Sequence, residues 1–188
     1  MPVPEITNEQ REIIHYVKEA LRQFNQKESY LISRDLSERC ICARFAMYLQ
    51  HVLYESQFHE YVVDVEYNRG SKGNEYAAKV LIVLNEMHRK KQQRPSTRKT
   101  EKIVVDLIAH KRGYDLETGF DNLLCIEMKK AYKNLDMSSD LFRLECLTNP
   151  LYDFGYKAGF MIVAVQDKDT DTYCLKIHRT YCNGMSTD

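Results

Sequence analysis

Hydrophobic residues recur at two spacings along the chain, and these spacings separate predicted helices from predicted strands. Recurrence every three or four residues predicts helices at about 7–26, 33–54, 76–89 and 139–148. Alternation with polar residues, or a short apolar run between turn residues, predicts strands at about 60–67, 103–109, 122–128, 159–165 and 172–178. The last residues, 183–188, follow neither pattern and are expected to be frayed. Helices before, between and after the strands predict an α/β fold with a mixed sheet flanked by helices.

A length of 188 residues fits a single domain, 1–188, better than two domains. We place the core at about 33–165, with the helix at 7–26 packed on it and a helical insertion at about 70–100. The segment 89–102 is basic, holds a proline and lacks apolar periodicity, which predicts a loop. That loop is either a solvated linker or an arm that contacts phosphate, and its composition favours neither.

Composition narrows the class of protein without selecting one. The 27 basic and 27 acidic residues cancel, so net charge does not support a nonspecific nucleic-acid coat, although it leaves room for a local basic patch. The apolar runs are too short to span a membrane and no signal peptide is evident, so we expect a cytoplasmic protein. The six cysteines form no C-x-x-C pair and are expected to be reduced thiols.

Charged residues interrupt the two predicted strands at 103–109 and 122–128. Asp106 lies within Ile-Val-Val-Asp-Leu-Ile-Ala, and Glu127 and Lys129 lie at the end of Leu-Leu-Cys-Ile-Glu-Met-Lys. Because side chains alternate along a strand, Glu127 and Lys129 are expected on the same face. A buried carboxylate is costly unless it is paired or binds a metal. The alternatives are therefore a metal site and a structural ion pair between Asp106 and Lys129 across neighbouring strands.

Glu38 lies in the first turn of the helix predicted at 33–54 and has two interpretations. It follows Asp35 by three residues, as in a capping box, and an acid near a helix N-terminus is favoured by the helix dipole. In the other interpretation, Glu38 faces the charged strand ends and takes part in the same site.

Several residues near predicted strand ends are weaker candidates for contacts with nucleic acid. The basic ones are Arg69, Lys111, Arg112 and Lys130. A turn or a solvated strand edge is the plain alternative for each. His110 shares the strand parity of Asp106 and either contacts phosphate or, as is commoner, forms a hydrogen bond at the strand end. Glu66 faces either the site or solvent.

Four stretches carry a resemblance to a known superfamily: LSERCICARFAMYL, VDVEYNR, VVDLIAHKRG and NLLCIEMKK. Asp106, then 20 residues, then Glu-Met-Lys at the end of an apolar strand, with a helix before and after, resembles the PD-(D/E)xK nuclease superfamily. Within it, the chain is similar to a group of small, uncharacterised bacterial or phage-type members. The resemblance covers about 33–165. Val105 is a departure, because the family often has proline at this position, but that proline is not a ligand.

The resemblance implies a restriction-endonuclease-like αβββαβ core and a metal-dependent nuclease that hydrolyses phosphodiester bonds, with DNA as the expected substrate. It implies that Asp106 and Glu127 bind Mg²⁺ or Mn²⁺. It also implies that Lys129 positions or deprotonates the attacking water, and that Glu38 reaches the metal through a water or a second ion. The expected partners are nucleic acid and, in a homodimer, a second copy of the chain. The alternative function is a catalytically silent binding or interaction module of a defence or mobile-element system.

Overall fold

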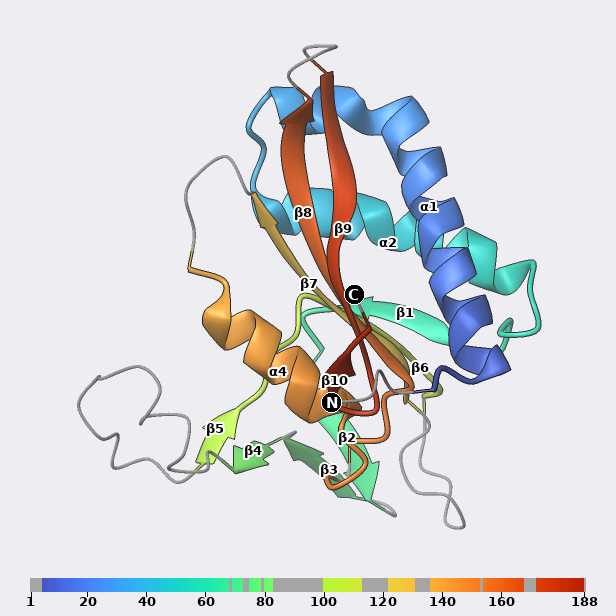
Figure 1. The fold of residues 1–188 in the computed structure, drawn as a ribbon, viewed down its shortest axis with the longest axis vertical. Coiled ribbons are helices and arrows are strands. Elements are labelled where there is room, and N and C mark those ends of the chain that lie inside the picture. The colour runs from blue at the N-terminus through green and yellow to red at the C-terminus, as the bar shows by residue number, and fades with distance from the viewer. Residues whose placement is uncertain are drawn as a thin grey trace.

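The computed structural model describes residues 5–67, 69–72, 75–78, 80–82, 100–112, 122–130, 136–152, 154–167 and 172–187. The helices of these ranges are α1 (Asn8–Ser33), α2 (Glu38–Tyr54) and α4 (Ser138–Thr148). The strands are β1 (Val62–Val65), β2 (Arg69–Lys72), β3 (Glu75–Ala78), β4 (Val80–Ile82), β5 (Thr100–Lys102), β6 (Leu107–His110), β7 (Asn122–Lys130), β8 (Ala158–Asp167), β9 (Thr172–Cys182) and β10 (Met185–Ser186) (Figure 1).

Six strands form one mixed sheet in the order β1-β6-β7-β8-β9-β10. All neighbours in this sheet pair antiparallel except β7 and β8, which run parallel. Parallel neighbours need a crossover connection, and α4 lies between β7 and β8 in the chain. The described part of the protein is therefore α/β with a mixed sheet flanked by helices, as the hydrophobic pattern predicts. It has six strands in this sheet and three helices.

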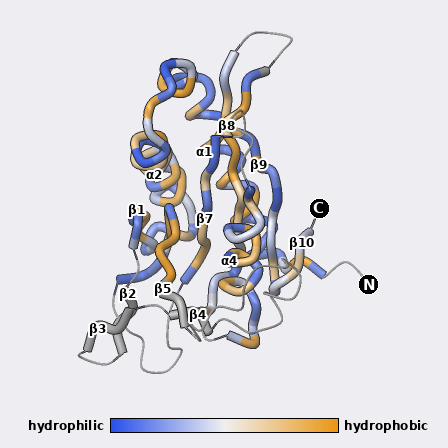
Figure 2. The backbone as a smooth tube through the Cα atoms, turned by 90° about the vertical axis from the view of Figure 1, so that its left-hand side faces the viewer, coloured by the Kyte–Doolittle hydropathy of each residue, from blue (hydrophilic) through white to orange (hydrophobic). Residues whose placement is uncertain are grey.

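Helices cover both faces of the sheet, and the central strands feed two hydrophobic layers. On β7, Leu124, Ile126 and Met128 lie in the layer that α1 and α2 complete, whereas Cys125 lies in the layer that α4 completes (Figure 1). Hydrophobic residues are concentrated along β7 and β8 (Figure 2). Burial on both faces explains why these two strands read as continuous apolar runs rather than as alternating ones.

The ends of the first two helices differ from the expectations. α1 begins after Thr7, as predicted, but continues past 26, because Ile32 is buried in the layer beneath it. The side chain of Ser37 caps α2, so the capping box expected between Asp35 and Glu38 is wrong. Asp35 instead has a positive φ of 54°, a non-helical conformation that separates α1 from α2. No helix of the described ranges is long and apolar enough to cross a membrane.

The predicted helical insertion is wrong where the structure describes it. β3 pairs with β2 and β4 pairs with β5, so strands occupy 75–78 and 80–82 in place of the helix expected at 76–89. Residues 83–89 lie outside the described residues, as does the basic segment up to 99. A short apolar run fits one face of a helix or a strand equally well, so periodicity alone could not decide.

Two further differences concern strand boundaries. β6 begins at Leu107, so Ile103 and Val105 precede the sheet, although both are buried in the layer under α4. The C-terminal residues expected to be frayed include β10, which pairs with β9. Asn183 and Gly184 turn the chain between these strands with φ values of 54° and 74°, a conformation that glycine adopts without strain.

Candidate functional site

The hairpin of β6 and β7 places Asp106 beside Glu127. The two strands pair antiparallel with Leu107 opposite Ile126, so the residue before Leu107 meets the residue after Ile126. Glu127 faces α4, because its neighbour Ile126 points into the opposite layer. A hydrogen bond of 2.7 Å from the Met128 backbone N–H to Asp106 Oδ2 holds Asp106 against β7. The structure therefore brings this predicted pair together.

Glu127 is almost fully buried and contacts α4. Only 1% of it is exposed, and its Oε1 accepts a hydrogen bond of 2.7 Å from Arg143 Nε. Arg143 also donates from its Nη2 to Asp140 Oδ1. Burial raises the pKa of Glu127 to about 8; the Arg143 guanidinium opposes this shift, whereas the charges of Asp106 and Asp140 increase it. The raised pKa means that the positive charge of Arg143 does not compensate fully for burial and for the neighbouring acids.

Lys129 connects the end of β7 to both helices that flank it. Its Nζ lies 3.7 Å from Asp140 Oδ2 and 3.8 Å from Glu38 Oε2. Glu38 Oε1 also accepts a hydrogen bond of 3.4 Å from the Lys130 backbone N–H. The first turn of α2 therefore reaches the strand end, as the second interpretation of Glu38 requires, and Glu38 contacts Lys129 rather than the two strand carboxylates.

Together these contacts join charged side chains from four parts of the chain. The residues are Asp106, Glu127, Lys129, Glu38, Asp140 and Arg143. Four carboxylates and two cations carry a formal excess of two negative charges when all are ionised. A single divalent cation would balance this excess.

Each of the two carboxylates, Asp106 and Glu127, is held by a protein donor through one of its oxygens. Asp106 Oδ1 and Glu127 Oε2 accept no hydrogen bond from the described residues, whereas the second oxygen of each is held by a protein donor. Mg²⁺ is commonly bound by one or two carboxylates with waters and phosphate oxygens completing its shell, and this donor set fits that pattern. The described ranges contain no group of three or more histidine, cysteine, aspartate or glutamate side chains placed to hold a metal. Direct protein ligation by more than these two carboxylates is therefore not indicated there.

The basic residues predicted to contact nucleic acid are mostly engaged in ion pairs. Arg112 Nη2 lies 2.6 Å from Asp64 Oδ1, and Lys111 Nζ lies 2.9 Å from Glu60 Oε2. Both side chains are partly exposed, so a phosphate can still approach them. Arg69 opens β2, and its side chain lies outside the described part.

Lys130 does not fit the prediction of a nucleic-acid contact. Only 6% of it is exposed, and its Nζ donates to the Asp35 carbonyl oxygen at 3.2 Å and to Asp35 Oδ1 at 2.8 Å. It lies on the face of β7 opposite Lys129 and anchors the strand end to the segment between α1 and α2. In the structure Lys130 therefore has a structural role, and its ammonium group is not on a surface that could bind nucleic acid.

His110 and Glu66 both take structural partners. His110 is buried, with Nε2 at 2.8 Å from Asp64 Oδ2, which agrees with a hydrogen-bonded histidine at the strand end. Burial alone would raise the pKa of Asp64, but hydrogen bonds from Arg112 and His110 outweigh it and lower that pKa. Glu66 is exposed, pairs with Arg39 at 2.7 Å and has a positive φ of 53°. It is therefore not among the clustered acids.

Sequence reasoning missed Asp140 and Arg143. Both lie on α4, three residues apart, and this spacing on a predicted helix indicates an ion pair between them. Nothing in the spacing indicates that the same arginine reaches Glu127, which depends on how α4 packs against β7. A helical pair of opposite charge close to an acid-bearing strand is the pattern that could have identified them.

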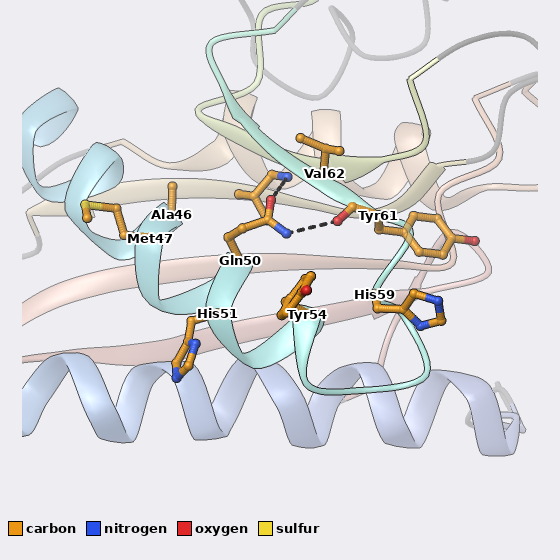
Figure 3. Close-up of a pocket in the computed structure, with 9 residues that line it drawn as sticks. Ala46, Met47, Gln50, His51, Tyr54, His59, Tyr61 and Val62 are labelled. Atoms are coloured by element: carbon orange, nitrogen blue, oxygen red, sulfur yellow. Dashed lines mark hydrogen bonds between the residues drawn. The ribbon is translucent and has the colours of Figure 1, made fainter.

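A separate hollow lies between α2 and β1. It measures about 690 Å³ and is lined by α2 side chains from Ala46 to Tyr54 and by residues 59 and 61–63 (Figure 3). Gln50 crosses it, donating from Nε2 to the Tyr61 carbonyl at 3.1 Å and accepting from the Val63 N–H at 2.7 Å. Because β1 is an edge strand, these bonds occupy backbone groups that face away from the sheet. No predicted site residue lines this hollow.

Comparisons with protein-family models, with curated proteins and with solved structures found no match. The arrangement of the charged residues around β7 is therefore the basis for any functional conclusion.

Proposed function

We propose that this chain is a metal-dependent nuclease that hydrolyses phosphodiester bonds in DNA. One observation carries the proposal: Asp106, directly before β6, lies beside Glu127 of β7, and each carboxylate has one oxygen that accepts no hydrogen bond from the described residues. Lys129 lies on the same face of β7 as Glu127. Oxygen ligands next to a lysine are the groups that metal-assisted phosphodiester hydrolysis requires.

The order of elements supports a restriction-endonuclease-like core for this nuclease. α2, β1, β6, β7, α4 and β8 follow one another as αβββαβ, with the short strands β2 to β5 inserted between β1 and β6. The three consecutive core strands β1, β6 and β7 pair antiparallel, and β8 joins β7 in parallel. In this core the acids would lie where β6 begins and β7 ends.

Each residue of the cluster has a role in the proposed reaction. Asp106 and Glu127 would hold Mg²⁺ or Mn²⁺, which when bound supplies an acidified water and neutralises charge on the scissile phosphate. Lys129 would orient the attacking water and stabilise developing negative charge. Glu38 contributes by holding the Lys129 ammonium from the side of α2.

The test is cleavage of duplex, single-stranded and branched DNA, and of RNA, with Mg²⁺ or Mn²⁺ and with EDTA. We expect metal-dependent cleavage that falls by about 100-fold or more in Asp106→Asn, Glu127→Gln and Lys129→Met, since each removes a group that acts on the reacting atoms. Glu145→Gln, an exposed change on α4, is the matched control and should cleave normally. Absence of metal-dependent cleavage on all four substrates would contradict the proposal.

A second candidate is the catalytically silent binding or interaction module. It is favoured by the ion pair of Glu127 with Arg143 and by the position of Lys129 between Glu38 and Asp140, because these contacts partly neutralise the cluster without a metal. This candidate predicts salt-sensitive binding of nucleic acid, or binding of a protein, with no metal-dependent cleavage. The cleavage assay separates the two candidates, because a silent module cleaves none of the four substrates with either metal.

A further inference from the structure

Arg143 bridges two buried carboxylates beside the proposed cation site. Its Nε donates to Glu127 Oε1 at 2.7 Å and its Nη2 donates to Asp140 Oδ1. The Arg143 side chain is 20% exposed, compared with 1% for Glu127 and 9% for Asp140, so both bonds are largely shielded from water. A planar guanidinium can satisfy two acceptors in a fixed relative geometry, which the point charge of a lysine cannot do.

The two strand carboxylates are held in the same manner. The Met128 backbone N–H occupies Asp106 Oδ2, and Arg143 occupies Glu127 Oε1. In each case the remaining oxygen accepts no hydrogen bond from the described residues. One donor is part of the sheet and cannot be moved by substitution, whereas the other is a side chain, which makes the role of Arg143 testable.

We propose that Arg143, anchored by Asp140, is a positioning residue that holds one oxygen of Glu127 and thereby presents the other to a divalent cation. This inference rests on the proposed metal site. Without Arg143 the terminal torsion of Glu127 is free, and fixing the carboxylate again lowers the affinity for the cation. Groups that orient a metal ligand typically change metal affinity by about 10- to 100-fold when they are replaced.

A purely structural ion pair makes a different prediction. It would change the stability of the fold but leave the affinity for the cation unaltered, since the orientation of the open oxygen would not depend on it. The substitution Arg143→Lys separates the two cases, because it keeps the positive charge next to Glu127 but cannot bridge Glu127 and Asp140 with the same geometry.

The experiment is calorimetric titration of the full chain with Mn²⁺ for wild type, Arg143→Lys, Asp140→Asn and Arg22→Lys. Arg143→Lys should raise the dissociation constant by about 10-fold or more. Asp140→Asn, which keeps the bond between Arg143 and Glu127, should raise it by a smaller factor. Arg22→Lys makes the same chemical change in an exposed ion pair on α1 and should leave it unchanged. Circular dichroism checks that each variant is folded, and Asp140→Asn keeps the test open if Arg143→Lys is not.

Cleavage assays add a second readout. Raising Mn²⁺ should restore the kcat of Arg143→Lys towards that of wild type, because the defect lies in binding the cation. Equal or tighter Mn²⁺ binding by Arg143→Lys, or no binding by wild type, overturns the inference. Wild type that binds Mn²⁺ through Glu127 but cleaves no nucleic acid overturns the nuclease and leaves the inference standing. If wild type cleaves nucleic acid but Arg143→Lys binds Mn²⁺ as tightly as wild type, the nuclease stands and the inference about Arg143 is overturned.

Discussion

Replacing Glu127 by glutamine should make the protein more stable relative to wild type as the pH rises. Folding raises the pKa of this carboxyl group from 4.5 to about 8, chiefly by burial. Between these two values the folded state binds more protons than the unfolded state, so the free energy of unfolding of wild type falls as the pH increases. The amide in Glu127→Gln cannot ionise and does not contribute this slope.

The size of the effect follows from the displacement of the pKa. At about 1.4 kcal/mol per unit, a shift from 4.5 to about 8 corresponds to about 5 kcal/mol over that pH window. This is a large share of the 5–15 kcal/mol or so that stabilises a typical domain. Groups with lowered pKa values, such as Asp64, change stability in the opposite direction at lower pH, but wild type and variant share them, so they cancel in the difference.

The assay is urea unfolding at pH 5, 6, 7 and 8 in EDTA, followed by circular dichroism. The quantity of interest is the difference in unfolding free energy between Glu127→Gln and wild type, which should grow by several kcal/mol from pH 5 to pH 8. The change in hydrogen bonding between the neutral carboxyl group and the amide adds an offset that does not depend on pH. Glu145→Gln, an exposed acid on the same helix as Arg143, should show no such trend. A difference that stays constant with pH would refute the assignment of Glu127 as a buried group with a raised pKa.

Three further substitutions test contacts outside the charged cluster. Lys130→Met should lower the unfolding free energy by about 1–3 kcal/mol, because it removes the partly buried bonds to Asp35. It should leave the salt dependence of DNA binding unchanged in a fluorescence titration. Gln50→Ala should lower the unfolding free energy measured in urea by about 1–2 kcal/mol, because the Tyr61 carbonyl and the Val63 N–H lose their side-chain partner. Gly184→Ala should lower the melting temperature, with a cost of about 1–3 kcal/mol, because φ is +74° and the added Cβ would meet the Asn149 side chain at 2.7 Å. A loss of stability within about 0.3 kcal/mol of zero for any of them would contradict the contact invoked for it.

The proximity of Asp106 and Glu127 could be predicted because it depends on local structure. Two apolar runs joined by a polar connection with two glycines are typical of an antiparallel hairpin, which brings the start of the first run beside the end of the second. Strand parity placed Glu127 and Lys129 on one face and Met128 on the other. Only a register error in the hairpin would have separated the acids, since a one-residue slip reverses every side chain.

The partners of these residues could not be predicted, because they come from helices whose positions depend on packing. Arg143 reaches Glu127 only because α4 crosses back over β7 and β8 on one face of the sheet. Glu38 meets Lys129 because α2 lies with its first turn at the end of β7. The local sequence around Lys130 is the same as that expected for an exposed lysine at a strand end. Its contact with Asp35, which comes from the segment between α1 and α2, depends on the tertiary structure.

The helix predicted at 76–89 shows a different limit. The run contains apolar residues that suit either one helix face or short strands, and its state depends on pairing with β2 and β5, which lie before and after it. Long-range pairing thus overrides a local spacing that has no strong preference of its own.

The sequence by itself determined the α/β class, five of the six strands of the central sheet and the shared face of Glu127 and Lys129, because these follow from local periodicity and strand parity. Only the tertiary structure decided that Arg143 and Asp140 join them, that Glu38 holds Lys129 and that Glu127 has a pKa of about 8. Burial and charge proximity are properties of elements packed together, and no single segment of the chain carries them.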